Sequence, residues 1–204
     1  MGNPRYKNGF SVTLHPDLIE LPFRWVKPRH IFVNSMSDLF HEAVPENFIS
    51  RVFDTMVRAD QHIYQILTKR SQRLVELAPS LSWPSNVWQG VSVEDSNHLW
   101  RITHLQEVPS AIRFVSVEPL IGPIPCLPLE GINWVIVGGE SGPNHRPIDR
   151  GWVIEIRDQC IDAGVPFFFK QWGGRTPKSG GRLLEGRLWD EMPAMIQTAE
   201  ASLM

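Results

Sequence analysis

Six short apolar runs recur along this chain, and each leads into a cluster of polar residues. Most of the runs are separated by stretches in which apolar residues repeat at helical spacing. This alternation is typical of βα units, which build parallel sheets. The sequence therefore predicts an α/β fold, a partial (βα) barrel of about six parallel strands, similar to a TIM barrel. The runs are residues 31–33, 63–67, 87–93, 112–117, 134–137 and 166–169.

The chain does not open with a strand, as a barrel normally does. A polar, Gly- and Pro-containing stretch (1–10) and a predicted short helix (about 17–25) precede the first apolar run. We therefore expect a barrel that lacks its first strand. Four prolines between Glu118 and Asn133 exclude a regular helix there, so an extended loop should connect the neighbouring strands.

The length of 204 residues and a hydrophobic content of 42% are enough for one core. We expect the barrel domain to span residues 1–172, with a Gly-rich basic segment, 173–204, packed on or near it. The longest apolar runs are too short to cross a bilayer, and residues 1–27 contain no secretory apolar core. Two cysteines make neither a disulfide framework nor a metal-type pair, so the expected location is the cytoplasm.

Polar residues follow the ends of the predicted strands. In the near-repeats 90–94 and 114–118, side-chain alternation places Ser92 and Glu94, like Ser116 and Glu118, on one face. The carboxyl ends of parallel strands converge on one rim, so the sequence predicts a pocket there. The alternative is a structural network in which Glu94, Glu118 and Glu140 form ion pairs with Lys69 and Lys170. The predicted pocket residues are Asn34, Asp38, Thr68, Lys69, Ser92, Glu94, Ser116, Glu118, Gly138, Gly139, Glu140, Ser141, Lys170 and Gln171.

Three other features bear on chemistry. The Gly-rich turn 138–143 offers backbone amides to an anion, although no phosphate-loop, dinucleotide-binding or zinc-protease motif is present. A metal site made of Asp38, His41 and Glu118 is an alternative to a metal-free pocket. Cys160 falls on the apolar stripe of a predicted helix, so we expect a core residue rather than a ligand.

The C-terminal segment is basic and contains aromatic residues. Although the net charge of −2 gives no general reason to expect nucleic acid, this segment could hold a phosphate backbone and stack a base. The alternative function is therefore a non-catalytic module that binds nucleic acid or a protein partner. Its residues would be Arg175, Lys178, Arg182 and Arg187, with Trp172 and Trp189 beside them.

Blocks spread along nearly the whole chain resemble a known family. They are residues 1–6, 32–41, 67–70, 90–94, 116–120, 137–143 and 169–174. These blocks are similar to the signature of the bacteriophage gene-product thirty-seven/sixty-eight family, also called three-Cys-motif proteins. That family is similar to radical S-adenosylmethionine barrels, and the resemblance implies a phage or prophage protein.

The resemblance also implies cofactors for full-length relatives. Their three-cysteine motif, ahead of the Met1-Gly2-Asn3-Pro4 block, holds a [4Fe–4S] cluster whose open iron binds S-adenosylmethionine. Cys126 and Cys160 cannot replace that motif, so we expect no cluster in the chain as given. Whether it is an enzyme then depends on an upstream three-cysteine segment. The substrate, a small molecule or a nucleic acid, is not identified by the sequence.

Overall fold

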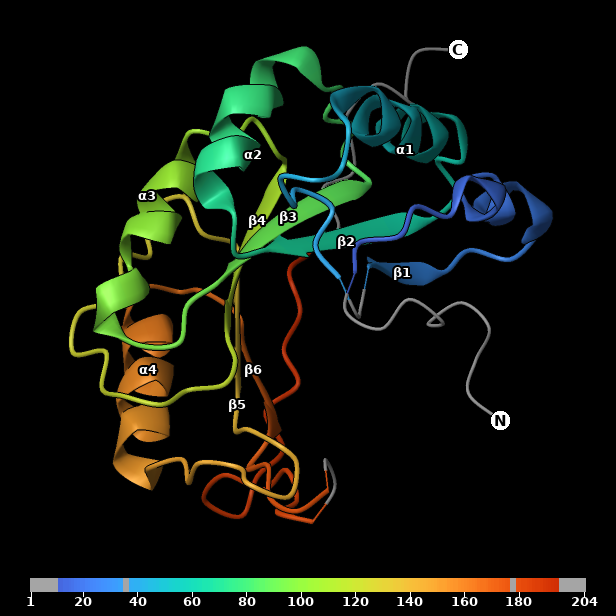
Figure 1. Cartoon of the computed structure of the whole chain (residues 1–204). Helices are drawn as coiled ribbons and strands as arrows, with labels where there is room; N and C mark the ends of the chain where they lie inside the picture. Colours follow the sequence, from blue (N-terminus) through green and yellow to red (C-terminus); the bar gives the residue numbers. More distant parts are fainter. Residues whose placement is uncertain (1–10, 35–36, 177–178, 195–204) are drawn as a thin grey trace.

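The computed structural model describes residues 11–34, 37–176 and 179–194. Its six strands form one sheet in which every neighbouring pair is parallel and the spatial order follows the sequence. The sheet curls into a half-barrel that does not close (Figure 1). The predicted fold class is therefore confirmed. The strands are β1 (His30–Val33), β2 (Ile63–Thr68), β3 (Val87–Ser92), β4 (Ile112–Val117), β5 (Trp134–Gly138) and β6 (Phe167–Gln171).

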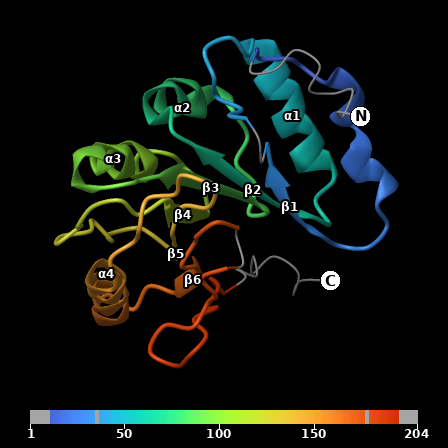
Figure 2. The same cartoon turned by 60° about the horizontal axis from the view of Figure 1, so that its bottom comes forward.

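Four α-helices lie on the convex face of the sheet (Figure 2). They are α1 (Glu46–Arg58), α2 (Ser71–Leu77), α3 (Trp100–Gln106) and α4 (Arg150–Asp162). As predicted, the Pro-rich connection between β4 and β5 contains no helix. None of the helices in the described ranges has the length and apolar character that a membrane span requires.

The segment before β1 differs from the prediction. Instead of one helix over 17–25, it forms two 3₁₀ turns, Pro16–Leu18 and Leu21–Arg24. Pro22 has no backbone N–H to continue an α-helical ladder, which explains the interruption. The Pro22 carbonyl instead accepts a hydrogen bond from His62 Nε2 at 3.0 Å, which attaches this segment to the sheet.

The two faces of the sheet have separate cores. The larger core fills the space between the sheet and the helices, and Val91, Val115 and Val135 belong to it. On the concave face a second cluster is dominated by the aromatic rings of Trp88, Phe114 and Trp134. Large apolar residues therefore fill most of the concave face below the carboxyl-end rim, although Gln65 on β2 shares this face with Ile63 and Leu67.

The C-terminal segment packs along the free edge of β6. Its residues Leu184 and Trp189 are buried in the larger core. The Phe169 amide donates to the Trp189 carbonyl at 2.8 Å, and Phe168 forms an antiparallel bridge with Asp190. Trp134 Nε1 donates to the Glu191 carbonyl at 2.8 Å, so the segment also reaches the concave face.

Candidate ligand-binding site on the concave face

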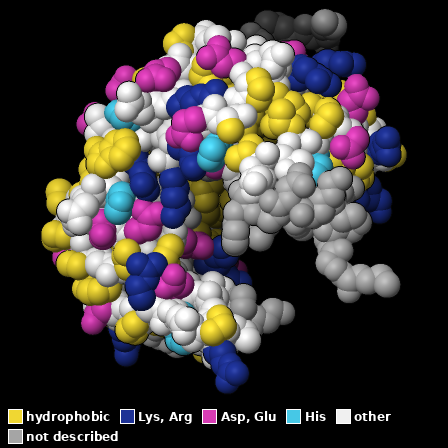
Figure 3. Space-filling view, in the orientation of Figure 1, with side chains coloured by type: hydrophobic (Ala, Val, Ile, Leu, Met, Phe, Trp, Pro, Cys, Tyr) yellow, Lys and Arg dark blue, Asp and Glu magenta, His cyan; other side chains and the backbone are white. Residues whose placement is uncertain are grey.

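Strand register brings the two predicted serines together. Ser92 and Ser116 are direct partners in the β3–β4 ladder, and both are buried. Side chains alternate between the two faces of a strand, so Ser92 lies on the same face as Trp88, and Ser116 on the same face as Phe114. Both serines therefore lie on the concave face, nearer the carboxyl ends of the strands than the aromatic rings. Figure 3 shows that the molecule is hollowed on this side, with hydrophobic side chains inside the hollow.

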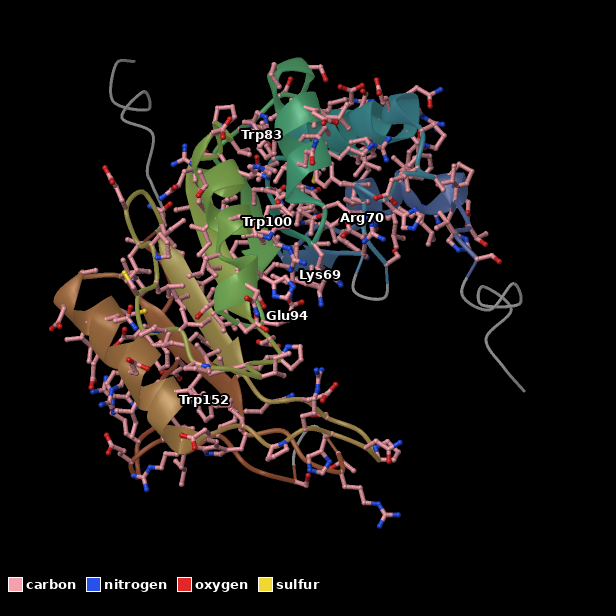
Figure 4. The ribbon with its side chains drawn as sticks, turned by 60° about the vertical axis from the view of Figure 1, so that its left-hand side comes forward. Lys69, Arg70, Trp83, Glu94, Trp100 and Trp152 are labelled. Atoms are coloured by element: carbon pink, nitrogen blue, oxygen red, sulfur yellow. The ribbon has the colours of Figure 1, made fainter. Side chains whose placement is uncertain are left out.

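Glu94 forms ion pairs with more cationic groups than the other rim carboxylates do. Its side chain is 9% exposed and forms an ion pair with Lys69, which is 50% exposed (Figure 4). Arg101 Nη1, from α3, donates to Glu94 Oε2 at 2.8 Å and to the Ser92 carbonyl at 2.8 Å. Burial alone would raise the pKa of Glu94, but Lys69, Arg101 and His98 outweigh it and hold that pKa below its ordinary value.

Glu118 repeats this arrangement on the next strands. Lys170 Nζ, at the end of β6, lies 2.7 Å from Glu118 Oε2. The glutamate side chain is 17% exposed and the lysine side chain 53%. Gly138 lies between them, where a Cβ atom would come within 3.1 Å of Glu118 Cδ. The buried carboxylate of Glu94 and the partly buried carboxylate of Glu118, each paired with a half-exposed lysine at the end of another strand, therefore lie at the rim of the apolar concave face.

Asp38 and Thr68 connect the chain after β1 to the end of β2. The Asp38 carboxylate accepts hydrogen bonds from Thr68 Oγ1 at 2.7 Å, the Phe40 and Lys69 amides at 3.0 Å, and Arg70 Nη1 at 3.1 Å. This carboxylate is fully used within the protein. Asn34, at the end of β1, is exposed and has a φ of 58°.

The Gly-rich turn after β5 packs against a second Gly-rich turn after β6. A Cβ atom at Gly139 would lie 2.1 Å from the Trp172 carbonyl oxygen, so only glycine allows this approach. The Gly139 amide donates to the Gln171 carbonyl at 2.9 Å, and the Gly142 amide donates to the Gly174 carbonyl at 2.9 Å. Both amides are used within the protein, so the anion-binding interpretation of this turn is not supported.

The polar residues of that turn are also paired. Glu140 accepts three hydrogen bonds from Arg146, from its amide at 2.9 Å, Nε at 2.8 Å and Nη2 at 3.0 Å. These bonds lower the pKa of Glu140 to about 2. Gln171 Nε2 donates to Ser141 Oγ at 3.1 Å, which ties β6 to the same turn.

Sequence reasoning missed two cationic partners of the rim, Arg101 and Arg146. Arg101 lies in the first turn of the helix that follows β3, which allows it to reach back to the strand end. This position could have predicted a contact between Arg101 and the rim, because the first turn of a βα helix lies beside the carboxyl end of the preceding strand. Arg146 lies in an irregular loop, and no periodic pattern marks it.

The cysteines do not fit a [4Fe–4S] cluster, which needs three thiolates on one loop beside an open iron. The chain has two cysteines, Cys126 and Cys160. Cys126 is exposed, and Cys160 is buried in α4, where burial raises the pKa of its thiol to about 12. Cys160 is thus the core residue that the sequence predicted.

The Asp38, His41 and Glu118 metal site is not formed. The described ranges contain no group of three or more His, Cys, Asp or Glu side chains that could hold a metal ion. Each of the three has another partner: Asp38 binds Thr68, His41 Nδ1 lies 3.1 Å from the Ala43 amide, and Glu118 pairs with a lysine.

The basic C-terminal segment uses its aromatic rings internally. Trp189 is only 8% exposed, and Arg187 lies 4.0 Å from its ring centroid. The Arg182 guanidinium lies 4.9 Å from the centroid of Phe168. Half-buried Trp172 packs on Phe169 and donates from Nε1 to the Leu183 carbonyl at 2.8 Å. Arg175 is exposed, and Lys178 lies outside the described residues.

A family model described as "Protein of unknown function (DUF5131)" matches residues 1–193. The chain belongs to this family. The DUF5131 match includes all six strands and every rim residue described above, so the concave-face site lies within the family domain. No curated protein and no solved structure is significantly similar to the chain.

Proposed function

We propose that this DUF5131 protein binds a small dipolar molecule on its concave face, at the carboxyl ends of the strands. The observation that carries the proposal is a pair of glutamates, the buried Glu94 and the partly buried Glu118, each paired with a half-exposed lysine at the rim of an aromatic cluster. The ligand would have an apolar or aromatic body together with one cationic and one anionic group.

The charges alone favour a ligand over a purely structural network. A buried carboxylate is costly to desolvate, and an ion pair whose lysine is half-exposed contributes little to stability. Each of the Lys69 and Lys170 ammonium groups has three N–H donors and pairs with one carboxylate within the described ranges, so donors remain for a ligand. A ligand carboxylate or phosphate could bind them, while a ligand cation could bind the glutamate oxygens.

The apolar part of the concave face supports the same proposal. Phe32 on β1 is 46% exposed, and Leu67, Ile136 and Phe168 are only partly buried around the aromatic cluster. An open apolar surface of this kind, rimmed by charged groups, is typical of a ligand-binding site. A planar ring placed here would cover these side chains.

S-adenosylmethionine has this combination of groups: an adenine ring, an α-carboxylate and an α-ammonium. We therefore propose it as the first ligand to test, in keeping with the resemblance to phage-encoded relatives of radical S-adenosylmethionine enzymes. The proposal concerns binding alone, because the residues present do not hold an iron–sulfur cluster.

Isothermal titration calorimetry with S-adenosylmethionine and S-adenosylhomocysteine tests this proposal. Saturable binding is expected for the unmodified protein, with at least a tenfold loss of affinity in Glu118→Gln. The matched control is Glu155→Gln, because Glu155 is exposed on α4, away from the concave face. The absence of binding, or equal affinity in Glu118→Gln and the control, would refute the proposal.

A further inference from the structure

A second cleft opens at the other end of the half-barrel. It has a volume of about 380 Å³ and lies at the amino ends of β1, β2 and β3. Ile63 and Trp88 are the buried apolar residues among those that line it. The His30 ring stands edge-on to Trp88, with 5.8 Å between centroids. This volume is within the usual range for small-molecule sites.

Two opposite charges in the cleft have no ionic partner. Arg29 precedes β1, and Asp60 follows α1; both line the cleft. Within the described ranges neither forms an ion pair, with the other or with any other residue. At the carboxyl-end rim, in contrast, Asp38, Glu94 and Glu118 each have a cationic partner.

Within the described ranges, no hydrogen bond or ion pair uses the side-chain polar atoms of Arg29 or Asp60. The Arg29 guanidinium lies 4.5 Å from the centroid of the Trp25 ring, a contact that leaves its N–H donors available. Burial, and to a smaller extent the negative charge of Asp60, raise the pKa of Tyr64 to about 12. The Asn86 amide, in contrast, donates to the Met56 and His62 carbonyls.

A ligand that satisfies both charges needs adjacent N–H donors for the carboxylate and adjacent acceptors for the guanidinium. Guanine presents both: its N1–H and N2–H groups suit a carboxylate, and its O6 and N7 atoms are the standard bidentate acceptors for arginine. Its flat ring would also contact the edges of His30 and Trp88. We propose that this cleft binds a guanine base.

The charged groups of the guanine proposal, Arg29 and Asp60, lie at the amino ends of the strands, opposite the rim glutamates, although Trp88 belongs both to this cleft and to the concave aromatic cluster. Calorimetric titration with guanosine 5′-monophosphate, with and without excess S-adenosylmethionine, separates the two proposals. Binding of the guanine nucleotide should be unchanged by S-adenosylmethionine, and adenosine 5′-monophosphate should bind at least tenfold more weakly, because adenine lacks the two adjacent donors.

Two substitutions test the predicted partners. Asp60→Asn should lose at least tenfold in affinity for the guanine nucleotide, and Arg29→Lys should do the same, because lysine keeps the charge but not the bidentate geometry. Asp54→Asn, an exposed position on α1, is the control. The proposal is overturned if no guanine nucleotide binds, if the adenine nucleotide binds equally well, if S-adenosylmethionine competes, or if Asp60→Asn matches the control.

Discussion

Replacing Gly90 with alanine tests the register that builds the concave face. A Cβ atom at this position would lie 2.3 Å from Phe114 Cε2 and 2.4 Å from Cζ, far inside van der Waals contact. The Phe114 ring is 1% exposed, so it has little room to move. We expect Gly90→Ala to destabilise the protein by about 1–3 kcal/mol through overpacking. Phe114→Leu alone should cost about 1–2 kcal/mol for the buried atoms that it removes.

The double variant distinguishes this clash from a general weakening of the strand. Because leucine frees the space that the new methyl group needs, Gly90→Ala/Phe114→Leu should be at least about 1 kcal/mol more stable than the sum of the two effects predicts. Urea unfolding followed by circular dichroism measures this difference. The control pair Ile156→Val/Phe114→Leu, on opposite faces of the sheet, should be additive. An additive result for Gly90 and Phe114 would refute the assigned faces of β3 and β4, and with them the position of Ser92 and Glu94.

The burial of Glu94, Cys160 and Trp189 can each be tested in solution. Despite its burial, Glu94 has a pKa below its ordinary value of 4.5, so the stability that it contributes is present above pH 4.5 and is lost on acidification. Glu94→Gln should therefore flatten the fall in melting temperature between about pH 5 and pH 3. A pH profile identical to that of the unmodified protein would contradict this expectation. In the native protein, Cys126 should react with a thiol reagent at pH 8, whereas Cys160 should react only after unfolding. Fast reaction of both thiols in the native protein would contradict the burial of Cys160. Trp189→Ala should cost about 3–5 kcal/mol and make the C-terminal segment sensitive to trypsin; wild-type stability would show that this ring is not part of the core.

The parallel sheet could be predicted because its signal is local and periodic. Each apolar run is long enough to mark a strand, and the alternation within 90–94 and 114–118 assigns faces to the side chains. The Pro-rich connection was predictable for a similar reason, since proline excludes helix whatever the rest of the fold does. These features depend on residues that are close in sequence.

The partners of the rim residues could not be predicted, because they depend on which loops meet in space. Gly139 resembles an anion-binding glycine in sequence, yet its role is to allow close contact with the chain at Trp172, a residue on another loop. Trp189 resembles a surface aromatic among basic residues, but it lies in the core beside Phe167. The roles of Gly139 and Trp189 become clear only from the three-dimensional arrangement of the strands and loops around them.

Methyl-resolved NMR during titration with S-adenosylmethionine tests the central claim most directly, because it shows where a ligand lies. The methyl groups of Leu67 and Ile136 line the concave face, whereas Ile161 is exposed on α4. We predict ligand-dependent shifts for Leu67 and Ile136 and none for Ile161. Shifts at Ile161 with none on the concave face, or no shifts at saturating ligand, would contradict the claim that this face is a binding site.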